Sequence, residues 1–302
     1  MKKILIGIVV VATLLETRAI AADLEVRATP PVPYSNWSGP YVGLGVFARY
    51  NAVDGNLTSA TVGTPAAAIP LPPKSPGCSN PLMFWCSGAG AMQYVDSISL
   101  GFRIYGGWNF QVAPTYIIGV EGDFGYANET SVFHGSPYPA NLLVGSLPFG
   151  GSPWDLFRVT TTWDGSARLR AGWLATPWMM LYLTGGVALT HLEAESTCAT
   201  APASPNVLNC APGNYFSGTL GPVSIINSAT KFGWTAGAGF DIALGSNWVA
   251  RAQYRFADFE FSFTDTRVCT GCPSATSSPL TISYQLPVMQ HIFELGLAYK
   301  FQ

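Results

Sequence analysis

The chain has 302 residues, of which 48% are hydrophobic, 13% aromatic and only 11% charged, and its formal net charge is −2. Charged residues make up about a quarter of a typical soluble domain, so this composition is unlike that of a soluble protein. There is no excess of basic residues, and therefore no positive field that would attract nucleic acid.

The first 21 residues have the pattern of a secretory signal. Lys2 and Lys3 give a positive start, Ile4–Leu15 is an apolar run too short to span a bilayer comfortably, and Ala19-Ile20-Ala21 matches a cleavage site. The alternative is an anchoring helix, but the length of the run and its small-residue ending favour cleavage. We therefore expect a signal peptide at residues 1–21 that is removed on export.

A proline-rich stretch follows the signal, at Thr29-Pro30-Pro31-Val32-Pro33. Proline cannot donate to a β-ladder, so this stretch is unsuited to a central strand. We expect residues 22–38 to form a periplasmic lead-in and residues 39–302 to form a single β-domain. No unbroken apolar run of helix-spanning length occurs after the signal.

The β-domain contains eight segments in which apolar and polar residues alternate. In the last of them the odd positions from Phe293 to Phe301 are all apolar or aromatic, whereas the even positions include Glu294 and Lys300. Alternate side chains of a strand point to opposite faces, so one face suits hydrocarbon and the other a polar interior. Only a closed barrel satisfies the backbone of strands in lipid. The eight segments are Tyr41–Tyr50, Tyr94–Phe110, Tyr116–Tyr126, Trp163–Trp173, Leu181–Leu189, Trp234–Ile242, Trp248–Phe256 and His291–Phe301.

The connections between these segments alternate between short and long. The three short ones, which carry Pro, Gly or Asn, are Gln111–Thr115, Thr176–Trp178 and Gly245–Asn247. The four long ones are Asn51–Ala91, Asn128–Phe157, Ser196–Lys231 and Asp265–Met289. Short periplasmic turns and longer outside loops are typical of outer-membrane barrels. The prediction is an all-β fold, an eight-stranded antiparallel up-and-down transmembrane β-barrel with long extracellular loops. Ten strands result if Asn51–Ala91 contains a hairpin.

Aromatic residues bracket the predicted spans, as in the two interfacial girdles of a membrane barrel. The alternative, the scattered core aromatics of a soluble β-sandwich, does not explain this bracketing. Beside the short turns or the chain ends lie Trp37, Trp108, Tyr116, Trp173, Trp178, Trp248, Tyr299 and Phe301. At the opposite ends lie Tyr50, Tyr94, Tyr126, Trp163 and Trp234.

The inward-facing positions collect charged residues of both signs. Eight strands enclose an interior just wide enough to be filled by side chains, and buried charges must be paired. We favour an ion-pair network that closes the lumen; the alternative is a narrow, charged channel for small solutes. The predicted network comprises Arg103, Glu121, Asp123, Asp164, Arg168, Arg170, Asp241, Arg251, Arg255, Glu294 and Lys300.

The six cysteines form three locally spaced pairs in the long connections. We expect disulfides between Cys78 and Cys86, Cys198 and Cys210, and Cys269 and Cys272, because exported chains with paired cysteines commonly form them. For Cys269 and Cys272 the alternative is a redox pair or half a zinc site, but no histidine lies nearby.

The three histidines offer weak grounds for catalysis. His134 lies in a predicted Gly/Pro-rich loop, and His191 and His291 have outward parity near the outer rim. An enzyme acting on lipids would need a Ser activated by one of them. We predict no catalytic, cofactor-binding or metal-binding residue and therefore no enzymatic activity. The long loops are the favoured interaction surface, in which Met83-Phe84-Trp85 is either an exposed anchor or a cap on the barrel mouth.

Several motifs resemble the small porin-family outer-membrane proteins of alphaproteobacteria, which include surface antigens of brucellae and rhizobia. The matching stretches are Ala22-Asp23-Leu24, Trp37-Ser38-Gly39-Pro40-Tyr41-Val42-Gly43, Gly119-Val120-Glu121-Gly122-Asp123, Arg251–Phe259 and the terminal strand. The resemblance implies an eight-stranded barrel similar to the OmpA transmembrane domain, with roles in envelope integrity and, in some members, haem or host-surface binding. Gln302 after Phe301 departs from the family, whose chains usually end on the aromatic residue.

Together these patterns predict an exported protein of the bacterial outer membrane with a structural or surface-interaction role. A narrow porin-like channel is the alternative, and a lipid-modifying enzyme is a weaker one. The expected partners are outer-membrane lipids and a host surface or small ligand at the extracellular loops, with no nucleic acid. The oligomeric state and any loop ligand are not specified by the sequence.

Overall fold

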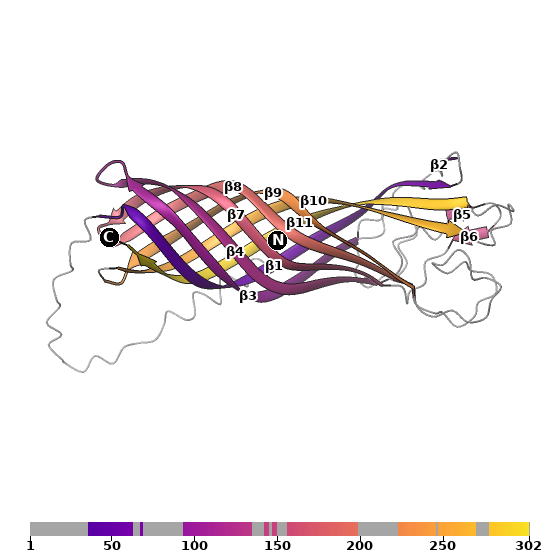
Figure 1. The fold of residues 1–302 in the computed structure, drawn as a ribbon, viewed down its shortest axis with the longest axis horizontal. Coiled ribbons are helices and arrows are strands. Elements are labelled where there is room, and N and C mark those ends of the chain that lie inside the picture. Colours follow the sequence, from indigo (N-terminus) through magenta and orange to yellow (C-terminus); the bar gives the residue numbers. More distant parts are fainter. Residues whose placement is uncertain are drawn as a thin grey trace, which may run out of the picture. The chain divides into compact units, whose positions relative to one another are not determined.

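The computed structural model describes residues 36–62, 67–68, 93–134, 142–144, 147–149, 156–198, 223–245, 247–269 and 278–301. All of them belong to one compact unit, Tyr34–Gln302. Eight long strands form its wall: β1 (Gly39–Val62), β3 (Gln93–Gln111), β4 (Tyr116–His134), β7 (Leu156–Thr176), β8 (Met179–Cys198), β9 (Val223–Ala243), β10 (Trp248–Cys269) and β11 (Ser278–Lys300) (Figure 1). The short strands are β2 (Ala67–Ala68), which pairs with β1, and the hairpin of β5 (Leu142–Val144) and β6 (Leu147–Phe149).

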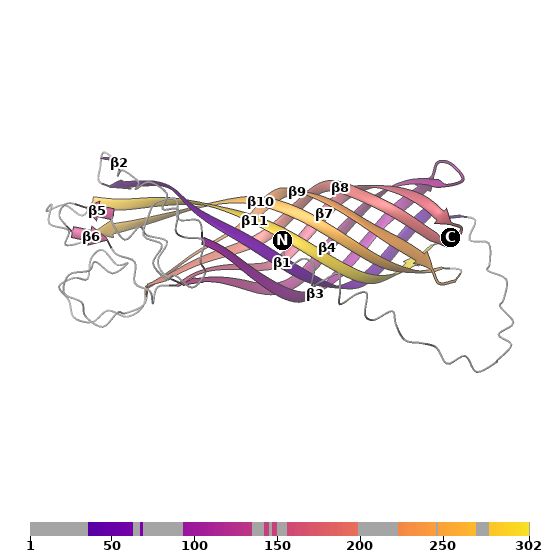
Figure 2. The ribbon, with the colours of Figure 1, turned by 180° about the vertical axis from the view of Figure 1, so that it is seen from behind.

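The eight long strands form a closed antiparallel ring. Each pairs with its neighbours in chain order, and β11 pairs with β1 from Tyr41↔Lys300 to Val62↔Leu280. Figure 2 shows β10, β11, β1 and β3 side by side along this closure. The predicted eight-stranded up-and-down barrel is therefore confirmed. Within the described residues no helix is long and apolar enough to cross a membrane.

Short connections join the strands in pairs at one end of the ring, which we call the turn end. The β3–β4 turn is closed by a hydrogen bond from the Val112 amide to the Tyr116 carbonyl, 3.0 Å. In the β10–β11 seam the Lys300 amide donates to the Asn247 carbonyl at 2.8 Å, and the Phe301 amide donates to the Pro40 carbonyl at 2.9 Å. The first and last strands are thus bonded at the turn end.

The strands are longer than the sequence pattern indicated, at 19 to 24 residues each. The predicted loops Asn51–Ala91, Asn128–Phe157, Ser196–Lys231 and Asp265–Met289 are therefore wrong at their borders, because the wall continues into each of them. We call the part of the wall farthest from the turn end the distal extension. It comprises residues 51–62, 93–97, 127–134, 156–162, 192–198, 223–233, 258–269 and 278–290.

The polarity of the wall inverts where the distal extension begins, as β10 illustrates. Before that point the exposed side chains include Tyr254, and the buried ones include Arg251 and Arg255. Beyond it Glu260 is exposed, whereas Phe259 and Phe261 are buried. A sheet that faces water on one side is polar outside and apolar inside. Side chains therefore continue to alternate between the two faces beyond that point, but the outward face becomes polar and the inward face apolar.

Candidate functional site: a lumen filled by paired charges

Twelve charged side chains converge inside the barrel, and each is at most 4% exposed. The members are Arg49, Arg103, Arg168, Arg170, Arg251, Arg255, Glu121, Asp123, Glu129, Asp164, Asp241 and Glu294. Six are basic and six acidic, so their formal charges cancel. This balance makes it possible for every buried charge to have an opposite partner.

Glu121 on β4 is the centre of one half of the network, the Glu121 cluster. Its carboxylate lies 2.6 Å from Nη2 of Arg168 and 2.6 Å from Nη1 of Arg251, with Arg170 at 3.7 Å. Arg251 and Arg170 also pair with Asp241, the former at 3.0 Å. These residues come from β4, β7, β9 and β10, so the cluster crosses the whole interior.

Asp123 and Asp164 are the centre of the other half, the Asp123 cluster. Asp123 pairs with Arg103, with Arg168 at 2.9 Å and with Arg255 at 3.0 Å. Asp164 pairs with Arg103 at 2.9 Å and with Arg255. Because Arg168 contacts both Glu121 and Asp123, it joins the two clusters into one network.

Two further carboxylates attach to the edge of the Asp123 cluster. Glu294 lies 3.0 Å from Nε of Arg103. Glu129 lies 3.0 Å from Nε of Arg49, which also reaches Asp164 at 3.2 Å. Arginine suits such a site because its planar group carries five donors and pairs with several acceptors at once.

Aromatic rings pack against the guanidinium groups and occupy the space beside them. The Arg170 guanidinium lies 3.7 Å from the centroid of the Tyr182 ring, and that of Arg251 lies 4.3 Å from the Tyr105 ring. A Cβ atom added to Gly43 or Gly296 would overlap the Tyr105 side chain. The glycines therefore leave the room into which the Tyr105 ring packs.

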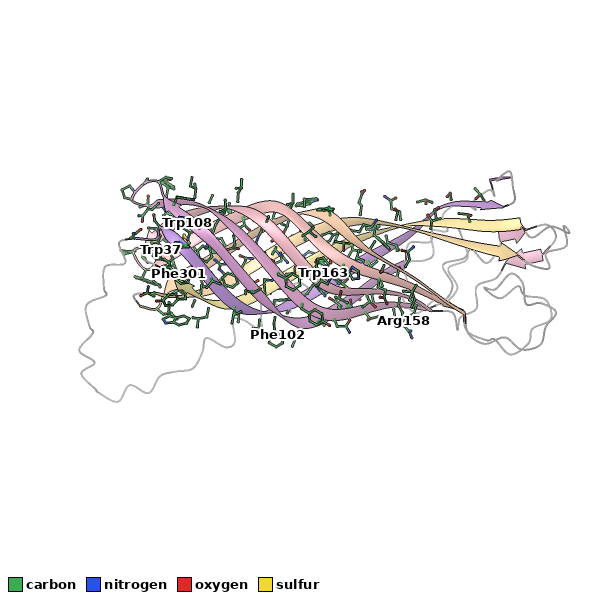
Figure 3. All side chains as sticks on the ribbon, viewed as in Figure 1. Trp37, Phe102, Trp108, Arg158, Trp163 and Phe301 are labelled. Atoms are coloured by element: carbon green, nitrogen blue, oxygen red, sulfur yellow. The ribbon has the colours of Figure 1, made fainter. Side chains whose placement is uncertain are left out.

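An apolar cluster around Trp37 is buried at the turn end of the lumen. The cluster comprises Trp37, Tyr41, Tyr105, Ile117, Met180, Tyr182, Val249 and Ala298. The Trp37 indole donates to the Pro177 carbonyl at 3.2 Å, and Figure 3 shows Trp37 at the same end as Trp108 and Phe301. Its assignment to the interfacial girdle is wrong: Trp37 is 1% exposed, because burying its large ring removes much apolar surface from water.

Apolar residues also fill the lumen on the other side of the charges. Phe47, Ala127 and Ile292 form a buried cluster next to the Asp123 cluster. The distal extension adds further buried side chains, namely Val53, Val159, Leu192, Ala194, Phe259, Phe261, Leu286 and Val288. The charged layer therefore lies between two apolar layers.

Ten of the eleven predicted lumen charges lie in the network, and Lys300 lies apart. The Lys300 ammonium is at the turn end and donates to the carbonyl of Asn36. Sequence reasoning missed Arg49 and Glu129. Arg49 has inward parity in a predicted strand and could have been found from that signal. Glu129 lies in a segment that we expected to be a loop, so its parity was not considered.

The predicted girdle residues lie outward at the turn end. Their exposed fractions range from 37% for Tyr299 to 59% for Tyr116, and the others are Trp108, Trp173, Trp178, Trp248 and Phe301. Figure 3 shows Trp108 at this end, Trp163 farther along the barrel and Arg158 farther still. Tyr126 and Trp234, at the opposite border, are 55% and 53% exposed.

Two histidines lie among the aromatic rings of that opposite border. His191 stacks on Trp163 with centroids 5.7 Å apart, and Nδ1 of His291 is 2.7 Å from the Tyr254 hydroxyl. The side chains of His134 and of all six cysteines, and the segment Met83-Phe84-Trp85, lie outside the described residues. Within those residues no group of three His, Cys, Asp or Glu is arranged to hold a metal ion.

A closed ring with an outward apolar band, aromatic borders and a charged interior defines a transmembrane β-barrel. The family model described as "Outer membrane protein beta-barrel domain" matches residues 19–301, and the chain belongs to this family. The predicted location in the outer membrane is thereby confirmed. In such barrels the short turns are periplasmic, so the distal extension lies outside the cell.

Curated relatives come from brucellae and rhizobia, as the resemblance predicted. The chain is 21% identical to the 31 kDa outer-membrane immunogenic protein of Brucella melitensis biotype 1 over 263 residues, which are 82% of this chain and 84% of the relative. Identity to the 25 kDa outer-membrane immunogenic protein of Brucella canis is 27%, covering 80% and 77%. For the 22 kDa outer membrane protein of Rhizobium leguminosarum bv. viciae, identity is 23%, covering 59% and 64%.

Similar solved structures include the following two. OprG from Pseudomonas aeruginosa has a TM-score of 0.41 and 13% identity, covering 89% of this chain and 99% of that one. Ail, the attachment invasion locus protein of Yersinia pestis, has a TM-score of 0.34 and 12% identity, covering 87% and 99%.

Proposed function

We propose that this chain is a non-enzymatic outer-membrane scaffold that does not conduct and that serves the envelope or displays its outer surface for interaction. The observation that carries the proposal is the buried network of six arginines and six carboxylates between two apolar layers. A solute would have to break several buried ion pairs to pass. Separating such a pair leaves uncompensated charge at low dielectric, which costs several kcal/mol.

The positions of the described histidines support a role without catalysis. A nucleophilic serine needs a histidine within hydrogen-bond reach. His191 and His291 instead contact aromatic rings on the outward face, with Nδ1 of His191 3.4 Å from the Thr230 hydroxyl. A variant with His134, His191 and His291 all replaced by Ala tests this point. The proposal expects an unchanged lipid profile of the outer membrane; altered acyl chains or headgroups would favour a lipid-modifying enzyme.

Single-channel recording tests the closed lumen. The refolded full chain, with folding verified by heat-modifiable gel mobility, is placed in a planar bilayer beside a large-pore porin as a positive control. The proposal expects conductance steps from the porin and none from this protein. Stable, ion-selective steps from the folded protein would contradict it and favour a narrow channel for small solutes.

Experiments on a deletion strain distinguish an envelope role from a surface role. Deleting the gene tests envelope integrity: sensitivity to detergent that is restored by the wild-type chain supports the structural role. A deletion strain with intact detergent resistance but reduced adhesion to host cells supports the surface role. A strain unchanged in both respects would count against the proposal.

Disulfides in the outer loops are part of the same proposal. Loops outside the cell lie in an oxidising compartment, where a local cross-link restricts the unfolded chain. We expect no thiol of Cys78, Cys86, Cys198, Cys210, Cys269 or Cys272 to be labelled in the folded, unreduced protein. Labelling at any of them would exclude that pairing.

A further inference from the structure

Pairing around the ring is interrupted at two places in the distal extension. β3 and β4 pair only from Phe102↔Tyr126 to Gln111↔Ile117, and β9 and β10 only from Gly233↔Phe259 to Ala243↔Val249. The other strand pairs continue into the extension, for example to Cys269↔Ser278 between β10 and β11. The distal extension therefore consists of two four-stranded sheets, β4-β7-β8-β9 and β10-β11-β1-β3 (Figures 1 and 2).

Each interruption leaves a seam between two strand edges. Within the described residues, Val223–Phe232 of β9 and Glu260–Cys269 of β10 pair with β8 and β11 respectively but not with each other. An edge of this kind presents a row of backbone donors and acceptors that can bind another extended chain. The two edges run antiparallel to each other, so a single inserted strand would pair antiparallel with one edge and parallel with the other.

The β3/β4 seam is bridged by hydrogen bonds between buried and half-buried side chains. Glu129 on β4 accepts hydrogen bonds from Ser97 at 2.6 Å and from Ser99 at 2.8 Å, both on β3. Ser97 also lies 2.7 Å from the Ser131 hydroxyl, and Glu129 pairs with Arg49. These contacts hold the two edges together, so we exclude this seam as a binding site.

The contact between described side chains that crosses the β9/β10 seam is a cation–π contact and not a hydrogen bond. The Lys231 ammonium, on an inward position of β9, lies 5.2 Å from the centroid of the Phe261 ring on β10. Phe259 and Phe261 are buried, whereas Thr230 and Glu260 on the outward positions are exposed. Among the side chains that the structure describes, no carboxylate lies within ion-pair distance of Lys231. As far as its side chains are described, the seam thus offers backbone edges, an apolar inner side and one cation.

We propose that the β9/β10 seam binds an extended peptide segment of a partner protein by strand addition. The segment has alternating apolar and polar residues, with apolar side chains directed inward and one inward carboxylate opposite Lys231. Because both edges converge on the paired residues Gly233 and Phe259, the seam accepts one strand and not the wall of a second barrel. This inference rests on the proposed function and identifies the surface through which a scaffold would interact.

A charge exchange tests the site in the full-length, refolded protein. The probe is a fluorescein-labelled peptide, Thr-Val-Thr-Glu-Thr-Val-Thr, compared with the same residues in block order and with a peptide carrying Lys in place of Glu. We expect the wild-type protein to bind the block-order peptide about tenfold or more weakly than the alternating Glu peptide. Lys231→Glu should weaken binding of the alternating Glu peptide by a similar factor and should strengthen binding of the Lys peptide. Arg158→Glu makes the same charge change on the exterior of the extension and leaves both affinities unchanged.

Hydrogen exchange reports on the backbone edges directly. Amides of residues 223–232 and 260–269 that do not pair with β8 or β11 exchange rapidly in the free protein and slowly with the peptide bound. Slow exchange in the free monomer would show the seam filled by this chain, and protection that grows with protein concentration would show a second copy there. Either result, or equal binding of the block-order peptide, overturns the inference. The conductance test of the closed lumen is unaffected by any of these results.

Discussion

Replacing Glu121 by Gln is the most direct test of whether the lumen is dry and closed. Gln has nearly the same shape and retains an acceptor for the Tyr41 hydroxyl, which lies 2.6 Å from the carboxylate. The substitution removes the negative charge that Arg168 and Arg251 each approach at 2.6 Å. The network then has six arginines and five carboxylates, so one buried positive charge has no negative counterpart.

The expected loss is that of a buried ion pair with one partner removed, about 3–5 kcal/mol in the free energy of unfolding. Glu195→Gln is the matched control, since Glu195 pairs with Arg158 at 3.3 Å with side chains 25% and 39% exposed. An exposed pair of this kind contributes about 0–1 kcal/mol. The double variant Glu121→Gln/Arg251→Met removes one charge of each sign and should recover part of the loss.

Urea unfolding in lipid vesicles, followed by tryptophan fluorescence at pH 7, measures these differences. Folding and unfolding branches must coincide before a free energy is taken from them. If Glu121→Gln loses no more than Glu195→Gln, water must solvate the network and the argument for a closed lumen fails. A loss in the double variant equal to the sum of the two single losses would also refute it, because it would show no coupling between the partners.

Three other substitutions test other layers of the barrel. Trp37→Ala removes the largest side chain of the turn-end cluster, so we expect the free energy of unfolding in urea to fall by about 3–5 kcal/mol. The variant should not conduct, because the charged layer remains. Conductance would show that Trp37 alone closes the lumen. Gly43→Val places a side chain where the Tyr105 ring lies, so the variant should not fold and should lose the heat-modifiable gel mobility of the folded barrel. Normal folding of the variant would contradict the packing of Tyr105 against Gly43. Phe102 is 75% exposed in the apolar band, so Phe102→Arg should lower the free energy of unfolding in vesicles by about 2–4 kcal/mol. The control Thr130→Arg, on the distal extension, should lower it little. Equal losses in the two variants would contradict the assigned membrane border.

The sequence by itself determined the barrel and the sense of each face, because the alternation of side chains in a strand is a local property. It predicted eight strands with ten as the alternative, and the pairing of the strands decided for eight. Parity alone placed Arg168, Arg251 and Glu121 inside, and aromatic positions placed Trp108 and Trp248 at a border. These inferences need no knowledge of which strands are neighbours, since the bilayer imposes the same outward chemistry on every strand.

Only the tertiary structure decided which charges meet and where the wall ends. Glu121 and Arg251 are far apart in the sequence, and the stagger of β4 and β10 around the closed ring brings them to 2.6 Å. The reversal of polarity beyond Tyr254 is ambiguous in one strand, because a loop and a water-facing wall share the same polar composition. Pairing with a neighbouring strand resolves it, and pairing is also what shows that the wall divides at the β9/β10 seam.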